Sequence, residues 1–111
     1  MKIKVIKIAT KDGGFYFWID GDQGFNSSEL LEILKPLDIV DCLRVHQSFG
    51  PAEYTDDIHT KAGIFRLREE FDEFAGATLH SENKALMNKI LAFMLKSGRY
   101  NIQQEQSLNP L

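Results

Sequence analysis

Between residues 84 and 98, apolar side chains recur every three or four positions, which is the spacing of one buried helix face. The stripe consists of Leu86, Met87, Ile90, Leu91, Phe93, Met94 and Leu95. Ser81 is placed to cap this helix, because its hydroxyl oxygen can accept a hydrogen bond from an amide of the first turn. Gly98 can take the left-handed conformation that ends a helix. The pattern predicts a long helix with a wide apolar face buried against a sheet.

A second, shorter helix is predicted to begin after Asn26, a residue type that favours the N-cap position. Glu29 follows three residues later, which is the spacing of a capping box. The buried stripe is expected to be Leu30, Ile33, Leu34 and Leu37. Pro36 cannot continue a helix comfortably, so we expect the helix to end near Lys35.

Strands are predicted where apolar and polar residues alternate. The expected strands span residues 3–9, 15–20, 39–49, 65–68 and 74–80, with residues 99–104 as a candidate edge strand. Gly13 and Gly14 supply the turn of a hairpin between the first two. In the strand at 39–49, the expected core face carries Ile39, Asp41, Leu43, Val45 and Gln47.

Two stretches show no such alternation. Residues 52–62 are the longest segment without a firm pattern, and we expect them to form a long loop of the kind that often carries function. Residues 70–73 are expected to form a turn between two strands. If the loop and the turn share one edge of the sheet, their side chains form a common surface.

Together these elements predict one α+β domain at residues 1–104, followed by a loose tail at residues 105–111. The expected order is ββαβββα, a mainly antiparallel sheet of about five strands with two helices packed on one face. Tyr16 and Trp18 alternate with the apolar residues of their strand and would lie on the face that the helices leave uncovered. A homodimer joined through this face is one interpretation.

The chain has 111 residues, of which 43% are hydrophobic and 26% charged, a mixture typical of a globular domain. Its single cysteine, Cys42, cannot form an internal disulfide, which fits a reducing compartment. The first ten residues alternate lysines with apolar residues and so lack the apolar run of a secretion signal. No apolar segment is long enough to cross a membrane. We therefore expect a cytoplasmic protein without a membrane partner.

The net charge of −3 is unevenly distributed. Residues 1–11 carry four lysines and no acid, whereas residues 12–60 carry ten acids against Lys35 and Arg44. Nucleic-acid binding requires a concentrated basic face, which this distribution does not favour. An acidic region instead attracts cationic partners, so the charge pattern predicts a basic protein as the partner.

Metal-binding and cofactor motifs fail on spacing. An EF-hand beginning at Asp20 would need glycine at Phe25 and glutamate at Leu31. Cys42 and the three histidines lack the paired spacing of zinc ligands. We therefore predict no metal site and no cofactor.

No nucleophile elbow or glycine-rich oxyanion turn accompanies the serines, histidines or cysteine of the chain. We therefore assign no catalytic residue and expect a protein that is not an enzyme. The alternative is a small-molecule-binding domain or small enzyme that uses His46, His59 and the loop at residues 51–62. A pocket holding both histidines would favour that alternative.

An acidic set with interleaved aromatic residues is the main functional candidate. Its predicted partner-binding residues are Tyr54, Asp56, Asp57, Glu69, Glu70, Asp72 and Glu73. Aromatic rings anchor protein partners, while charge around them accelerates encounter. The alternative interpretation is a solvated acidic edge with the rings turned inward.

The run EFAGATLHSENKALMNKILAFMLKSGRY, residues 73–100, resembles the C-terminal part of several small bacterial toxin-immunity proteins. In those proteins a strand leads through a serine or asparagine cap into a final helix that ends near a glycine and an aromatic residue. The resemblance covers about a quarter of the chain. It implies a non-catalytic protein that neutralises a basic toxin through an acidic surface.

Overall fold

The computed structural model describes residues 2–49, 52–70 and 75–104. Within these ranges the chain forms an α+β fold of one seven-stranded sheet and two α-helices. The strands are β1 (Ile3–Ala9), β2 (Phe15–Asp20), β3 (Ile39–Phe49), β4 (Ala52–Thr60), β5 (Gly63–Glu70), β6 (Gly76–His80) and β7 (Tyr100–Gln104). The helices are α1 (Ser27–Ile33) and α2 (Lys84–Ser97), with short 3-10 turns at Gly21–Gln23 and Lys35–Leu37.

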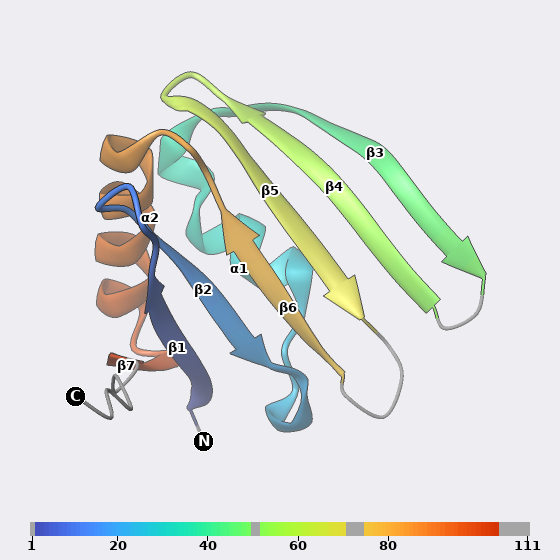
Figure 1. Cartoon of the computed structure of the whole chain (residues 1–111), viewed down its shortest axis with the longest axis horizontal. Coiled ribbons are helices and arrows are strands. Elements are labelled where there is room, and N and C mark those ends of the chain that lie inside the picture. The colour runs from blue at the N-terminus through green and yellow to red at the C-terminus, as the bar shows by residue number, and fades with distance from the viewer. Residues whose placement is uncertain (1, 50–51, 71–74, 105–111) are drawn as a thin grey trace.

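The strands follow the order β3-β4-β5-β6-β2-β1-β7 across the sheet (Figure 1). Neighbouring described strands are antiparallel except β1 and β7, which run parallel because α2 connects β6 to β7. The candidate edge strand at residues 99–104 is therefore confirmed as β7. The sheet has two edges, the short β7 and the eleven-residue β3.

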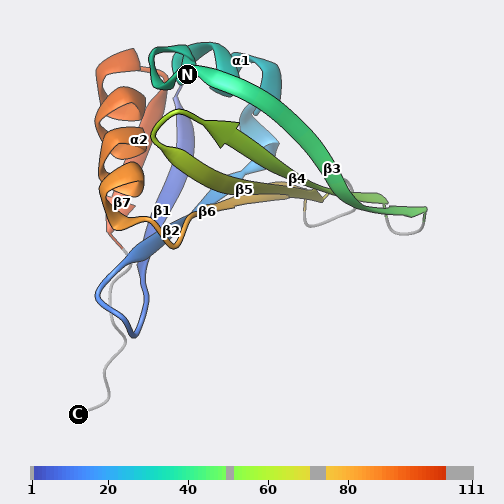
Figure 2. The same ribbon diagram turned by 90° about the horizontal axis from the view of Figure 1, so that it is seen from above.

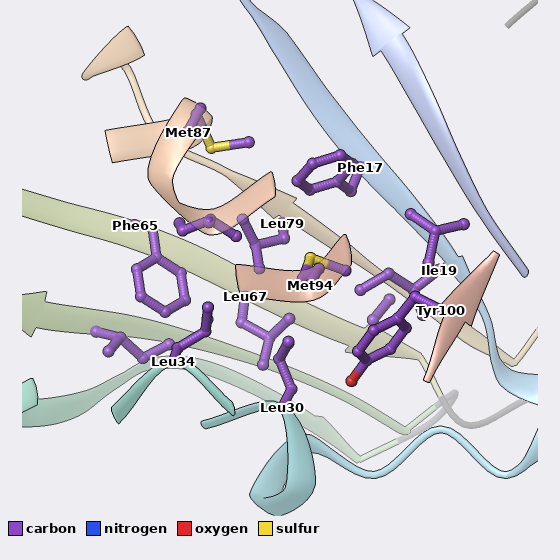
Figure 3. Close-up of a cluster of buried hydrophobic side chains, with 14 of the residues drawn as sticks. Phe17, Ile19, Leu30, Leu34, Phe65, Leu67, Leu79, Met87, Met94 and Tyr100 are labelled. Carbon is purple, nitrogen blue, oxygen red and sulfur yellow. The ribbon is translucent and has the colours of Figure 1, made fainter. Parts of the chain in front are cut away.

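Both helices cover the same face of the sheet, as predicted (Figure 2). We call this the helix-side face and its opposite the outer face. Phe17 and Phe65, from strands in the middle of the sheet, are fully buried against the helices. Met87 and Met94 of α2 complete the core with Leu30 of α1 (Figure 3). Most of the apolar stripe predicted for the long helix thus packs in the core: Leu86, Met87, Ile90 and Met94 are buried, and Leu91 and Phe93 are partly buried. The prediction is wrong for Leu95, which is 55% exposed.

The long helix is capped differently from the sequence prediction. Asn83, not Ser81, is the N-cap, and its side chain accepts a hydrogen bond from the amide of Leu86. The Ser81 hydroxyl donates to the carbonyl of Ile64 and accepts from the amide of Asn83. Ser81 therefore ties β5 to the residue that caps α2. For α1 the predicted cap is confirmed: Asn26 accepts from two amides of the first turn.

The predicted count of about five strands is wrong, because the segment expected as a loop at residues 52–62 contains β4. Among the side chains of β4 that the structure describes, only Ile58 is a buried apolar residue, and acids, threonines and a histidine fill most other positions. Alternation is lost because polar, mostly half-buried side chains occupy both faces of this strand. Glu69 and Glu70, expected in a turn, belong to β5 instead.

The predicted core face of β3 is confirmed for Ile39, which is partly buried against the core, and is wrong for the residues that follow it. The side chains from Val40 to Gln47 are all exposed. The strand lies at the sheet edge, and its register against β4 shifts between Ile39 and Asp41 and again between Arg44 and His46. Each shift leaves an extra residue on β3, so its side chains do not follow a simple alternation.

Two predictions fall outside the described residues. They are the tail at residues 105–111 and most of the turn at residues 70–73. Among the helices that the described ranges form, none combines the length and the apolar character required to span a bilayer.

Candidate functional site: the β3–β5 arm

The three strands β3, β4 and β5 form an arm on one side of the molecule. Figure 2 shows the far ends of β3 and β4 extending past both helices. The described part of the arm comprises residues 39–49 and 52–70. Because no helix lies against its far end, the arm presents side chains to solvent on both faces. Five of the seven predicted partner-binding residues lie on it.

These five residues divide between the two faces. Directly paired residues on antiparallel strands share one face. Asp56 pairs with the buried Leu67, so its carboxylate lies on the helix-side face, together with Tyr54 and its partner Glu69. The structure therefore brings Tyr54, Asp56 and Glu69 together.

Asp57 and Glu70 lie on the outer face. Asp57 pairs with Arg66, which stands between the inward-facing Phe65 and Leu67, and Glu70 pairs with Glu53 in the same alternation. Asp72 and Glu73, the last two of the predicted set, lie outside the described residues. The acidic set is thus two smaller groups on opposite sides of the arm. A single flat partner surface cannot contact both groups at once.

On the outer face, each described acid of the set is held by an arginine of β5. Arg66 donates two hydrogen bonds to Asp57, at 2.7 and 3.1 Å. This contact lowers the pKa of Asp57 and raises that of Arg66. The pair is a bidentate ion pair between neighbouring strands, a geometry that fixes both side chains.

Arg68 binds two carboxylates on the same face. Its Nε and Nη2 atoms donate to Glu53 at 2.8 and 3.1 Å, and Nη2 lies 3.1 Å from Glu70. One guanidinium thus offsets two acids. A surplus negative charge remains at this point of the outer face.

The helix-side face has its own arginine. Arg44 of β3 donates to the carboxylate of Asp56, and its guanidinium lies 4.3 Å from the centre of the Tyr54 ring. The charge of Glu69 further favours the cationic form of Arg44. Tyr54 is therefore covered by a cation rather than standing free as an aromatic anchor.

The arm nevertheless keeps a net negative charge. Residues 39–49 and 52–70 carry six acids against four lysines and arginines, and Asp38 directly precedes them. Within the described ranges, Asp38, Asp41 and Glu69 form no ion pair with a lysine or arginine. These three carboxylates, rather than the paired ones, are available to a cationic partner.

Sequence reasoning missed the apolar part of the arm surface. Val40, Leu43, Val45 and Ile64 expose 63, 46, 49 and 51% of their surface. Three of them belong to β3, and two of these, Leu43 and Val45, were assigned to the core face. A signal was present in the sequence, because the expected core face included the carboxylate of Asp41, which burial would penalise.

No family model, curated protein or solved structure matches this chain.

The alternative site at His46 and His59 is not assembled. His46 lies opposite Thr55, whereas His59 lies opposite Asp41. His59 lies four positions along β4 from Thr55, which corresponds to about 13 Å along a strand. The hollows beside Gly21, Ser81, Trp18 and Ser28 include neither histidine among their lining residues. Among the described side chains, no three His, Cys, Asp or Glu converge as metal ligands.

The outer face also carries the two aromatic residues proposed for a homodimer. Tyr16 and Trp18 alternate with the buried residues of β2, so they lie on this face and are half-buried. The ring of Tyr16 meets His80 edge-on at 6.4 Å between centroids. The indole of Trp18 covers Gly76, where a side chain would meet it. Both rings are thus packed along the sheet surface.

Proposed function

We propose that this protein is a non-catalytic binding module that uses the β3–β5 arm to engage a basic protein. The observation that carries the proposal is the combination on one projecting element of surplus carboxylates and exposed apolar side chains. Partner-binding surfaces combine apolar contact area with charges that guide encounter. The specific form we propose is the neutralisation of a basic toxin.

Surplus charge selects the class of partner. The acids of the arm exceed its lysines and arginines by two, out of an excess of three for the whole chain. The field of these charges extends roughly 8 Å into physiological salt, so a cationic surface is drawn toward the arm before contact. Ion pairs within the arm do not remove this excess.

Apolar residues of the arm provide contact area. Leu43 of β3 and Ile64 of β5 are about half exposed, although most side chains of their size are buried in the sheet. Burying each of them beneath a partner would contribute on the order of 1 kcal/mol. The paired arginines Arg66 and Arg68 would then lie at the rim, already held in position by their carboxylates.

The proposal is tested by co-expression with the protein encoded by the adjacent reading frame, followed by affinity capture and a growth-rescue assay. We expect stable capture and relief of toxicity. Capture should weaken at least tenfold for Asp41→Lys and for Glu69→Lys. Each of these substitutions raises the net charge by two and breaks no ion pair among the described residues.

Asp22→Lys is the matched control, because it makes the same charge change on the turn between β2 and α1, outside the three strands of the arm. Its capture should stay within about threefold of the unmodified protein. Absence of capture, or equal weakening by all three variants, would refute the role of the arm.

A further inference from the structure

Strand β3 is a long, uncovered edge of the sheet. It is hydrogen-bonded to β4 on one side, and it ends the strand order on the other. In an antiparallel pair, roughly half of the backbone N–H and C=O groups of an edge strand point away from its neighbour. Figure 1 shows no described element beside the outward edge of β3. These groups form a template for one more strand.

The usual protection of sheet edges is weak here. Edge strands are commonly short or carry outward lysines or proline. β3 has eleven residues and contains no lysine or proline, and its one arginine is engaged by Asp56. Two register shifts are present, but the segment from Asp41 to Arg44 between them pairs regularly with β4.

Side chains on β3 indicate what kind of strand fits. Leu43 is about half exposed and lies on the outer face together with Asp41, because the two residues pair with Asp57 and His59 of β4. Asp41 carries a carboxylate without a lysine or arginine partner among the described residues. An added strand with alternating apolar and basic residues can place its basic residues opposite both: the ammonium group of one lysine meets the Asp41 carboxylate, and the aliphatic stem of the next covers Leu43.

The β3 strand of a second copy of this chain does not alternate apolar and basic residues. Its own β3 offers one cation, Arg44, which is already bound to Asp56. Pairing centred on Arg44 would place two guanidinium groups opposite each other, which destabilises a strand pair. Pairing centred on Leu43 would place Asp41 opposite Val45 of the second copy and would leave Asp41 without a cation.

We infer that an extended segment of the partner, with alternating basic and apolar residues, adds to β3 as an eighth strand. Backbone hydrogen bonds along the edge supply affinity, and Asp41 with Leu43 supplies preference. The inference rests on the proposed function for the identity of the partner. Its recognition chemistry, however, belongs to the edge itself and can be tested without that partner.

The test uses a capped heptapeptide of alternating lysine and valine, titrated into the isotope-labelled full chain and followed by amide chemical shifts. We expect the largest shifts at residues 39–49. A twin peptide methylated at every backbone nitrogen has the same side chains but cannot donate backbone hydrogen bonds, so it should produce no such shifts. Asp41→Lys should weaken binding about fivefold, while Asp22→Lys should leave it unchanged.

Several outcomes overturn the inference. Equal shifts with the methylated twin would show that side chains alone bind the peptide. Shifts centred on Tyr16 and Trp18, or no shifts, would place binding elsewhere or nowhere. A dimer whose β3 amides are protected before peptide is added would show that a second copy occupies the edge. Partner capture with a failed peptide test refutes this inference alone, whereas peptide binding without partner capture refutes the proposed function.

Discussion

Asp56 and Asp57 are adjacent in the chain, yet their carboxylates lie on opposite faces of β4 and bind different arginines. Asp56 accepts a hydrogen bond from Arg44 on the helix-side face, and Asp57 accepts from Arg66 on the outer face. A paired acidic motif in a strand is therefore two separate sites. The candidate surface therefore consists of the carboxylates of the arm that form no ion pair among the described residues, rather than of the run of adjacent acids.

The Asp57–Arg66 contact predicts a measurable titration. Because the hydrogen bond from Arg66 favours the charged form, the pKa of Asp57 lies below its ordinary value. Such a group stabilises the fold above the pKa of the unfolded chain, about 4, and that contribution is lost as the pH falls through the lower folded-state pKa. Arg66→Gln should return the pKa of Asp57 toward its ordinary value. Carbon-detected carboxylate titration measures it, and an unchanged pKa would contradict the assignment.

The core prediction compares two adjacent residues of β5. Phe65 is fully buried among the side chains of α1 and α2, whereas Ile64 is 51% exposed on the outer face. Phe65→Ala should lower the free energy of unfolding by about 3–5 kcal/mol, because it leaves a cavity. Ile64→Ala should change it by less than about 1 kcal/mol. Urea denaturation checks both values, and similar losses would mean that the burial of β5 is misassigned.

Tyr100 carries a buried hydroxyl for which the described residues provide no hydrogen-bond partner. Figure 3 shows its ring within the core cluster. An unpaired buried hydroxyl costs about 1–3 kcal/mol, so Tyr100→Phe should not destabilise the protein and should raise its free energy of unfolding by about 1 kcal/mol. A loss of stability would show that the hydroxyl has a partner.

The same residue predicts a difference at high pH. Burial raises the pKa of Tyr100 to about 12. Between about pH 10, the ordinary tyrosine value, and pH 12, the unfolded chain would lose this proton before the folded protein does. Stability should therefore fall over this range in the unmodified protein more steeply than in Tyr100→Phe. Urea denaturation at pH 9 and pH 11 measures the difference, and parallel curves would contradict it.

Gly76 allows the close approach of β6 to β2. A Cβ atom there would lie 2.8 Å from the backbone carbonyl oxygen of Ile19 and about 3.5 Å from the indole of Trp18. Gly76→Ala should therefore lower the free energy of unfolding by about 1–3 kcal/mol, since a backbone atom must move. Thermal and urea unfolding both report this loss, and a neutral effect would mean that the strands separate easily at this point.

Elements with strong local signals could be predicted from the sequence. The apolar stripe of α2 and the cap of α1 at Asn26 follow directly from residue type and spacing. The alternation of Phe15, Phe17 and Ile19 with the two outward aromatics likewise identified which side of β2 is buried. In each case the environment is a helix-covered face, which forces a periodic pattern.

The arm could not be predicted in the same way. Polar, mostly half-buried side chains occupy both faces of β4, so burial imposes no apolar–polar alternation on residues such as Asp56 and Asp57. The register shifts of β3 moved Asp41 and Leu43 away from the expected core. Which carboxylates remain unpaired depends on cross-strand arginines, and strand neighbours are set by tertiary structure rather than by local sequence.

The proposed function requires the β3–β5 arm to contact the partner. Hydrogen–deuterium exchange of the full chain, alone and with the protein captured in the co-expression test, measures this contact. We expect exchange to slow at least tenfold across residues 39–49 and 52–70, with the largest effect in β3, while β1, β2 and α2 stay unchanged. Protection centred on β1 and β2 around Tyr16 and Trp18, with an unaffected β3, would contradict it.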